Sequence, residues 1–314
     1  MSILWFDFFA KKHHFVYIDV MSKIFIELRN QALVKKTMQS FVDACRSFGH
    51  DVHICAPFSG STPGSEEFSK CDLAILWNGI HSKYRKYREL IDLWGVKTLF
   101  VELGWYPQRQ TFQVDPKGFN MEASWANDPL QATGKQRISI PNKEELLVIL
   151  QLDIDTQIQQ HSPYFKDMAS FINFLAEVSP RKLRIRKHPR HKPSPAVSSA
   201  VQIHKNCFWD DSPNLVEAMS KCKAVATINS SSGVEALIKG YPVLCFGNAI
   251  YRHSGAVLCC TNDKKETRKA IANLDRAGIW QQKVNELIER LMDKQWTIPE
   301  VPKKLRPLLE EALK

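Results

Sequence analysis

The segment Ala224–Phe246, AVATINSSSGVEALIKGYPVLCF, decides the fold class. Its apolar run Ala224–Ile228 predicts a buried strand, Gly233–Lys239 predicts a short helix, and Val243–Phe246 predicts a second strand. Gly240 and the proline two residues later end the helix, because glycine accepts a left-handed conformation and proline cannot continue a helix. A strand, a helix and a strand at this spacing form a βαβ unit, which indicates a parallel sheet.

Short apolar strands and amphipathic helices alternate on both sides of this unit, which predicts an α/β protein. In the first part of the chain we expect strands at 24–27, 52–56, 73–77 and 97–102 and helices at 33–48 and 81–93. Residues 104–142 lack a steady period and predict a long loop. After it we expect strands at 146–152 and 183–187, helices that open at Ser162-Pro163 and Ser212-Pro213, and helical structure at 264–294.

A chain of 314 residues is too long for one ordinary core and predicts two domains. We assign residues 1–142 to a first domain with its linker, and residues 143–314 to a second domain with the C-terminal helices. Two successive α/β halves imply a cleft between them, and open parallel sheets bind ligands at the carboxyl ends of their strands. The residues that follow each strand are therefore the candidate site residues.

The composition is that of a soluble globular protein, with 44% hydrophobic and 24% charged residues. No apolar run approaches the ~18 residues that a membrane-spanning helix needs. At the N-terminus the apolar stretch precedes the basic residues, which is the reverse of a signal peptide. The eight cysteines form no CxxC pair and no zinc-ligand spacing. We therefore expect a cytoplasmic protein with reduced thiols.

The positive charge is concentrated in one segment. The formal net charge is +10, and residues Arg181–Lys205 contain eight lysines and arginines and no acidic residue. Such a segment binds phosphate, nucleic acid or an anionic surface, or it forms a solvated basic face. Because the sequence has no recognised nucleic-acid module and no basic stripe interleaved with aromatic residues, we expect no nucleic-acid partner.

The first strand of the second domain ends in polar residues. Gln151, Asp153 and Asp155 follow an otherwise apolar run, where carboxylates are costly unless they are paired or used in chemistry. One structural alternative is capping of a following helix by Asp155 or Thr156. The Asp-x-Asp spacing also fits a metal-dependent transferase, although a three-residue pattern is weak support.

The next strand ends at Lys187-His188-Pro189, because proline cannot donate to a sheet ladder. A histidine at this rim can donate a hydrogen bond to a phosphate or assist a leaving group. The alternative is an ordinary turn residue.

The third strand end is the most specific. Asn229, three serines at 230–232 and Gly233 join the strand to the following helix, whose free N–H groups and serine hydroxyls predict an anion site. Simple N-capping by Ser230 or Ser231 is the alternative. Glu235 can accept a hydrogen bond from a ribose hydroxyl or can lie exposed on the surface.

Four ordered blocks carry a family resemblance: FVELGWYPQRQTFQVDPKGFN, QLDIDTQI, RKHPR and NSSSGVEALIKGYPVLCFGNAIY. Together they resemble the bacterial capsule polysaccharide biosynthesis family, which includes the β-Kdo transferases. The resemblance covers roughly residues 70–255. The triple serine before Gly233 departs slightly from the family's usual pattern, which leaves open which serine binds the donor.

The resemblance implies a GT-B-like fold, in which two Rossmann-like domains with mainly parallel sheets face a central cleft. It also implies a glycosyltransferase that uses a CMP-activated ulosonic acid such as Kdo, with no cofactor and no metal. Carried over, the catalytic residues are Asp155 as nucleophile, Glu102 as base, and His188. The donor-binding residues are Gln151, Lys187, His188, Asn229, Ser230, Ser231, Ser232, Gly233 and Glu235. A retaining double displacement needs two such carboxylates over one sugar.

The acceptor implied by the resemblance is a glycan or a lipid-linked glycan, and contact with the cytoplasmic face of the inner membrane follows from the latter. Trp105, Tyr106, Arg109 and Trp125 can stack on acceptor sugars, or each can be local packing. Three other interpretations stay open at this point: a sialyltransferase of the same fold, a nucleotide-sugar epimerase, and a non-catalytic protein of the capsule pathway.

Overall fold

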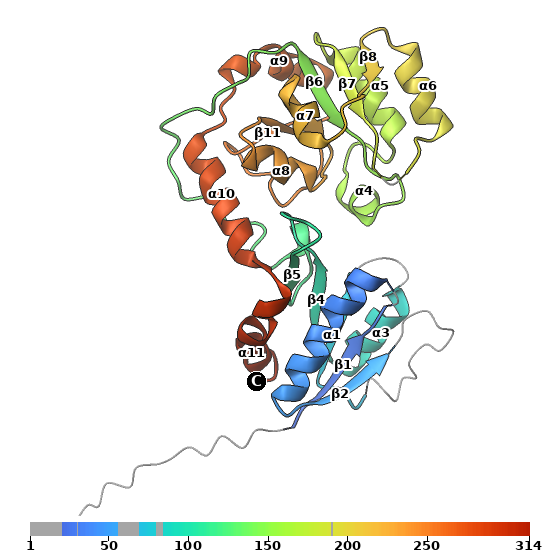
Figure 1. The fold of residues 1–314 in the computed structure, drawn as a ribbon, viewed down its shortest axis with the longest axis vertical. Helices are drawn as coiled ribbons and strands as arrows, with labels where there is room; N and C mark the ends of the chain where they lie inside the picture. The colour runs from blue at the N-terminus through green and yellow to red at the C-terminus, as the bar shows by residue number, and fades with distance from the viewer. Residues whose placement is uncertain (1–20, 30, 56–68, 80–83, 190) are drawn as a thin grey trace, which may run out of the picture.

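The computed structural model describes residues 21–29, 31–55, 69–79, 84–189 and 191–314 (Figure 1). The described residues form two six-stranded sheets with helices packed on them. Residue 56 of one expected strand and residues 81–83 of one expected helix lie outside the described residues. No helix of the described part is long and apolar enough to cross a membrane.

The first sheet is mixed. Its spatial order is β12 (Gln295–Trp296), β5 (Phe112–Asp115), β4 (Lys97–Leu103), β3 (Leu73–Trp77), β1 (Lys23–Glu27) and β2 (Asp51–Cys55). Strands β1 to β4 are parallel, whereas β5 and β12 run antiparallel to their neighbours. Helices α1 (Ala32–Ser47) and α11 (Val301–Ala312) share one apolar core with the sheet, and α3 (Arg85–Trp94) forms another.

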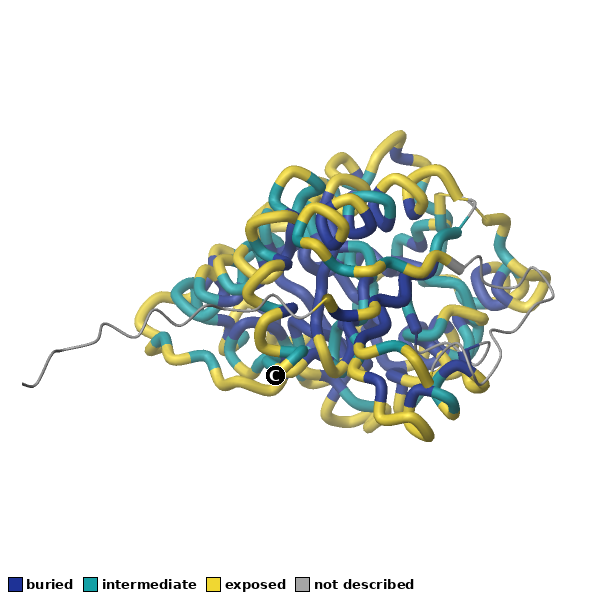
Figure 2. The backbone as a smooth tube through the Cα atoms, turned by 90° about the horizontal axis from the view of Figure 1, so that it is seen from below, coloured by how far each residue is buried: buried dark blue, intermediate teal, exposed yellow. Residues whose placement is uncertain are grey.

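The second sheet is parallel throughout. Its spatial order is β11 (Leu258–Cys259), β10 (Val243–Cys245), β9 (Cys222–Thr227), β6 (Glu145–Ile149), β7 (Leu183–Arg186) and β8 (Cys207–Trp209). Its central strands β10, β9 and β6 are buried between two apolar cores, whereas the edge strands β8 and β11 are not. In the molecule as a whole, the buried segments lie inside and the exposed ones mostly at the periphery (Figure 2). The predicted βαβ unit at 224–246 is confirmed as β9, α8 and β10, and so is the α/β class with two mainly parallel sheets.

The helices of the second half are shorter and more numerous than expected. They are α4 (Thr156–His161), α5 (Met168–Val178), α6 (Pro195–Ile203), α7 (Leu215–Ser220), α8 (Ser232–Ile238), α9 (Lys264–Ala272) and α10 (Gln281–Lys294). Short 3₁₀ turns are also present, among them η2 (Asn120–Glu122) in the first half and η3 (Leu274–Arg276) and η4 (Ile298–Glu300) in the second. The expected helical stretch at 264–294 is thus broken between α9 and α10.

Two predicted helix starts are wrong. Helix α5 begins at Met168 rather than after Ser162, because the Asp167 side chain accepts a hydrogen bond from the Ser170 N–H at 2.7 Å. Helix α7 likewise begins after Asn214, whose side chain accepts from the Glu217 N–H at 2.9 Å. Aspartate and asparagine cap as well as serine, so a Ser-Pro pair did not discriminate between neighbouring caps.

The expected loop at 104–142 contains a strand, β5. Its sequence FQVD has polar residues at alternate positions, yet all four side chains are buried. The Asp115 carboxylate accepts hydrogen bonds from the N–H groups of Lys117 and Ser124, and Gln113 donates to the Leu103 carbonyl at 2.8 Å. Buried polar groups that are hydrogen-bonded in this way are tolerated, and the hydrophobic pattern does not register them.

The expected end of the second domain is wrong. After α10 the chain returns to the first sheet, where β12 pairs with β5 and α11 packs on α1 (Figure 1). Trp296 is 6% exposed and its ring lies 6.2 Å from that of Phe112 and 6.3 Å from that of Phe41. Residues 295–312 therefore complete the first domain. A two-residue strand leaves no periodic signal, which is why the pattern missed this return.

The basic segment is partly neutralised by the fold. Arg184 on β7 pairs with Glu145 of the neighbouring strand at 2.8 Å, and Arg186 pairs with Asp210. Arg181 pairs with Glu144 at 3.0 Å. The acids that balance these arginines come from other segments of the chain, so a count along the sequence exaggerated the local charge.

We expect residues 295–312 to contribute a large part of the first domain's free energy of unfolding. Trp296→Ala should lower the free energy of unfolding by about 3–5 kcal/mol, the range for removing a buried aromatic side chain. Trp94→Ala is the matched control, because Trp94 is 48% exposed and should change stability by less than about 1 kcal/mol. Urea unfolding followed by circular dichroism measures both. Equal effects of the two substitutions would contradict the packing described here.

Candidate active site

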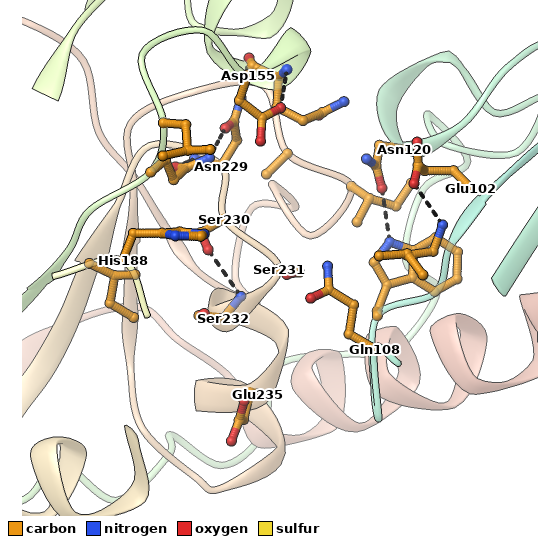
Figure 3. Close-up of a pocket in the computed structure, with 18 of the residues that line it drawn as sticks. Glu102, Gln108, Asn120, Asp155, His188, Asn229, Ser230, Ser231, Ser232 and Glu235 are labelled. Carbon is orange, nitrogen blue, oxygen red and sulfur yellow. Dashed lines mark hydrogen bonds between the residues drawn. The ribbon is translucent and has the colours of Figure 1, made fainter. Parts of the chain in front are cut away.

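One cavity of about 700 Å³ lies between the two sheets. Most of the residues that line it lie at or just after the carboxyl ends of β3 and β4 in the first sheet and of β6, β7 and β9 in the second. Figure 3 shows Glu102, Gln108 and Asn120 on one side and Asp155, His188 and Ser230 on the other. The structure therefore brings most of the predicted residues to one site, as expected for strand ends of two facing sheets.

Gln151 and Asn229 join the strands of the second domain. The Gln151 side-chain amide donates to Asn229 Oδ1 at 2.8 Å, and the Asn229 N–H donates to Gln151 Oε1 at 3.1 Å. Asn229 also donates to the Gln157 carbonyl at 2.8 Å, which ties α4 to the end of β9. The polar groups of both residues are used within the protein, and they hold the wall of the cavity in place.

Asp155 both caps a helix and lines the cavity. It is the N-cap of α4, where its Oδ1 accepts from the Gln157 N–H at 2.9 Å, so the capping alternative is confirmed. The same residue is exposed and lines the cavity. Asp153 accepts instead from the Met168 N–H at the start of α5, at 2.7 Å. The described residues contain no group of three or more His, Cys, Asp or Glu side chains that could hold a metal ion.

The three serines at the start of α8 differ in their contacts. Ser230 Oγ accepts from the Ser232 N–H at 3.2 Å, which stabilises the turn between β9 and α8. Ser231 occupies the N-cap position without a side-chain capping bond. All three serines line the cavity, whereas Gly233 does not. A Cβ atom at Gly233 would lie 2.5 Å from Tyr251 Cζ, so glycine is needed here for packing against Tyr251 rather than for contact with a ligand.

Two basic residues follow β7 and line the same cavity. Lys187 is exposed, and its Nζ lies 4.8 Å from the centre of the Trp209 ring. The His188 ring lies 5.1 Å from that of His191, and it is placed on the same side of the cavity as Ser230 (Figure 3). Glu235, one turn into α8, also lines the cavity.

Glu102 is the carboxylate of the first domain. Asn78 Nδ2 donates to its Oε2 at 2.7 Å, and the Leu103 N–H donates to its Oε1 at 2.9 Å. Burial raises the pKa of Glu102 above its usual range, and the negative charge of Asp155 acts in the same direction. The two hydrogen bonds act in the opposite direction, because they stabilise the ionised form.

The aromatic residues expected to stack on an acceptor are placed differently. Trp105 is 3% exposed, its indole N–H donates to Asn120 Oδ1 at 3.0 Å, and its ring packs edge-on against Trp125 at 5.6 Å. Trp105 lines the cavity, but its side chain packs within the protein as the packing alternative expected. Tyr106 lies 6.0 Å from the Lys239 ammonium, and Arg109 is exposed in the cavity.

The backbone of this loop is held by one side chain of the returning segment. Gln295 Oε1 accepts from the N–H groups of Trp105 and Tyr106 at 3.0 and 3.1 Å, and its amide donates to the Tyr106 carbonyl. Gln295 is itself buried on β12. The position of the loop that carries Arg109 therefore depends on the C-terminal return.

Sequence reasoning missed several cavity residues: Asn78, Gln108, Asn120, Gln157 and Tyr251. The Asn78-Gly79 pair directly after a strand was a usable signal, since such a pair marks a turn at a strand end. The others sit in loops or helix starts whose course the pattern did not predict.

Comparisons with known proteins agree with this architecture. The β-Kdo 2,7 transferase of Thermosulfurimonas dismutans KpsC is similar over 90% of this chain and 99% of that chain, with a TM-score of 0.56 and 16% identity. The β-Kdo 2,4 transferase of the same protein is similar over 91% and 98%, with a TM-score of 0.53 and 17% identity. Likeness at this level of identity concerns the fold, and it agrees with the GT-B-like arrangement expected above.

Two curated proteins are similar in sequence. Protein FixF of Sinorhizobium fredii is 29% identical over 188 residues, which is 52% of this chain and 46% of that protein. The capsule polysaccharide export protein KpsS of Escherichia coli is 31% identical over 122 residues, 35% of this chain and 31% of that protein. The chain thus aligns with less than half the length of either relative.

A family model described as capsule polysaccharide biosynthesis protein matches residues 123–288, which is more than half of the 314-residue chain. The matched region contains three of the four sequence blocks that carry the resemblance, together with the second-domain wall of the cavity. The chain therefore belongs to the capsule polysaccharide biosynthesis protein family.

Proposed function

We propose that this protein is a glycosyltransferase that moves Kdo, or a related ulosonic acid, from a CMP-activated donor to a glycan or lipid-linked acceptor in bacterial surface polysaccharide synthesis. The observation that carries the proposal is the pair of carboxylates, Glu102 and Asp155, which come from different domains and line one cavity. The fold shared with two structures described as β-Kdo transferases supports the choice of sugar.

The donor phosphate would bind at the second-domain wall. Lys187, His188 and the Ser231 hydroxyl line the cavity together, and they supply positive charge and hydrogen-bond donors for a phosphate oxygen. These groups meet the phosphate without a bridging cation. Glu235 would accept from a ribose hydroxyl of the nucleotide.

The reaction would be a double displacement. The Asp155 carboxylate attacks the anomeric carbon, the bond from that carbon to the phosphate oxygen breaks, and CMP leaves with the electron pair. Glu102 then takes the proton of the acceptor hydroxyl while the acceptor oxygen attacks the same carbon and releases Asp155. Two inversions at one carbon give net retention. Burial raises the pKa of Glu102, which makes its carboxylate a better proton acceptor.

The test of the function is release of CMP from CMP-Kdo by the purified protein, with and without excess EDTA. We expect CMP release with both, because the phosphate contacts named above need no metal. UDP-sugars are the matched control and should give none. Loss of turnover in EDTA, with recovery on adding a divalent ion, would contradict the metal-free donor site, and no release from CMP-Kdo would contradict the proposed donor.

Substitutions of the two carboxylates should block different steps of the reaction. Asp155→Asn keeps the α4 cap, because asparagine caps as well as aspartate, but it should abolish both transfer and slow donor hydrolysis. Glu102→Gln given donor alone should accumulate an adduct heavier by one sugar residue on the peptide that contains Asp155. Intact-protein mass spectrometry and peptide mapping measure it.

Asp153→Asn is the control for these variants, because Asp153 also accepts a helix-start hydrogen bond nearby, and it should form product at close to the wild-type rate. Wild-type donor hydrolysis by Asp155→Asn, without an adduct in Glu102→Gln, would remove Asp155 from the role of nucleophile.

His188→Ala should impair use of the donor while the fold stays intact. Loss of one charge-assisted contact to phosphate is worth ~1.5–3 kcal/mol, or about 10- to 150-fold in kcat/KM for the donor. The free energy of unfolding should change by no more than ~1 kcal/mol. His191→Ala is the control, since His191 neighbours His188 but does not line this cavity. Equal kinetics of the two variants would favour the turn-residue interpretation of His188.

A further inference from the structure

A buried cluster at the end of β1 holds the peptide that precedes Asn78. Glu27 is fully buried, and its Oε2 accepts from the Trp77 N–H at 3.0 Å. The Trp77 carbonyl accepts from the Tyr84 hydroxyl at 2.5 Å and from Arg29 Nη2 at 3.3 Å. Arg29 also pairs with Glu27 at 2.7 Å. The backbone N–H and C=O groups of Trp77 are thus both hydrogen-bonded by side chains that do not line the cavity.

The turn that follows aims one side chain at Glu102. Asn78 has a φ of 66° and Gly79 a φ of 68°, so two successive residues adopt the left-handed region. Asparagine accepts this conformation better than most residues. A Cβ atom at Gly79 would lie 2.6 Å from the Phe100 ring, so the turn packs closely against β4. The Asn78 amide then reaches Glu102 Oε2 at 2.7 Å.

The surroundings of Glu102 oppose ionisation on balance, and the Asn78 amide is one of the groups that counteract them. Burial and the charge of Asp155 favour the neutral acid, whereas the Leu103 N–H, the Asn78 amide and the charge of Arg29 favour the carboxylate. Arg29 is shared with Glu27, to which it is directly paired. Asn78 is the side chain that donates directly to Glu102 within the described part of the chain.

We propose that Asn78, whose preceding peptide is held by Glu27, Arg29 and Tyr84, is the positioning residue of Glu102: it donates to the carboxylate and orients it for proton transfer from the acceptor. This inference rests on the role of Glu102 as the base under the proposed function. It assigns a purpose to a left-handed turn and to the hydrogen-bonded cluster of Glu27, Arg29 and Tyr84, which the reaction itself does not use.

Two substitutions distinguish the effect of the Asn78 amide from the effect of the turn conformation. Asn78→Gly removes the amide and keeps a residue that accepts the left-handed conformation. Asn78→Asp keeps the size and the turn preference but turns a donor into a like charge beside Glu102. Asn120→Gly is the matched control, because Asn120 also has a positive φ of 53° and lines the cavity, but its side chain accepts from Trp105 rather than contacting Glu102.

The direct readout is the titration of Glu102 by carbon NMR of protein labelled at glutamate side-chain carboxyls, with the Glu102 signal identified by its loss in Glu102→Gln. We expect the midpoint to rise by about one pH unit in Asn78→Gly and further in Asn78→Asp, and to stay unchanged in Asn120→Gly. An unchanged midpoint in both Asn78 variants would overturn the inference. If Asn78→Gly does not fold, Asn78→Asp decides alone.

The second readout is the pH dependence of sugar transfer to the acceptor. The acid limb should move to higher pH by the same amount, because the base must lose its proton before it can act. Adduct formation on Asp155 should be unaffected, and the Asn78 substitutions should cause no further loss in a Glu102→Gln background. Unaltered pH dependence despite a shifted NMR midpoint would overturn the kinetic role of Asn78. Wild-type transfer by Glu102→Gln would instead overturn the base assigned under the proposed function.

Discussion

The pairing of β12 with β5 is the contact on which the arrangement of the cavity depends. Through it the chain, having built the second sheet, returns to the edge of the first. Trp296 fills the core between α1 and the sheet, and Gln295, its neighbour, holds the loop that carries Arg109. One strand of two residues therefore serves both the stability of a domain and the form of the site.

Much of the fold followed from hydrophobic periodicity. The strand at 73–77 and the βαβ unit at 224–246 were predicted nearly to the residue, because a buried parallel strand is a continuous apolar run. What periodicity could not supply were elements stabilised by hydrogen bonds of polar side chains, such as β5 with Gln113 and Asp115. The return of residues 295–312 was missed because a long-range pairing leaves no local trace.

The candidate site was predicted as a set of strand ends rather than as a geometry. That rule gathered Asp155, His188 and Ser231 correctly, since it depends on sheet topology alone. It could not show that the side chains of Gln151 and Trp105, which also line the cavity, form hydrogen bonds within the protein. It also missed Asn78, whose importance comes from a contact with a neighbouring strand and not from its own position in a pattern.

The crossing of α10 from one sheet to the other has a consequence for synthesis on the ribosome. The chain is made from its N-terminus, so the first five strands of the first sheet emerge before any of the second, but the sixth emerges after all of it. While the second domain is synthesised, the edge of β5 and the face of α1 that later contact β12 and α11 are therefore uncovered. Exposed strand edges and apolar faces are the features that attract unwanted association. Chaperone protection during translation would be most valuable for the domain that is made first and finished last.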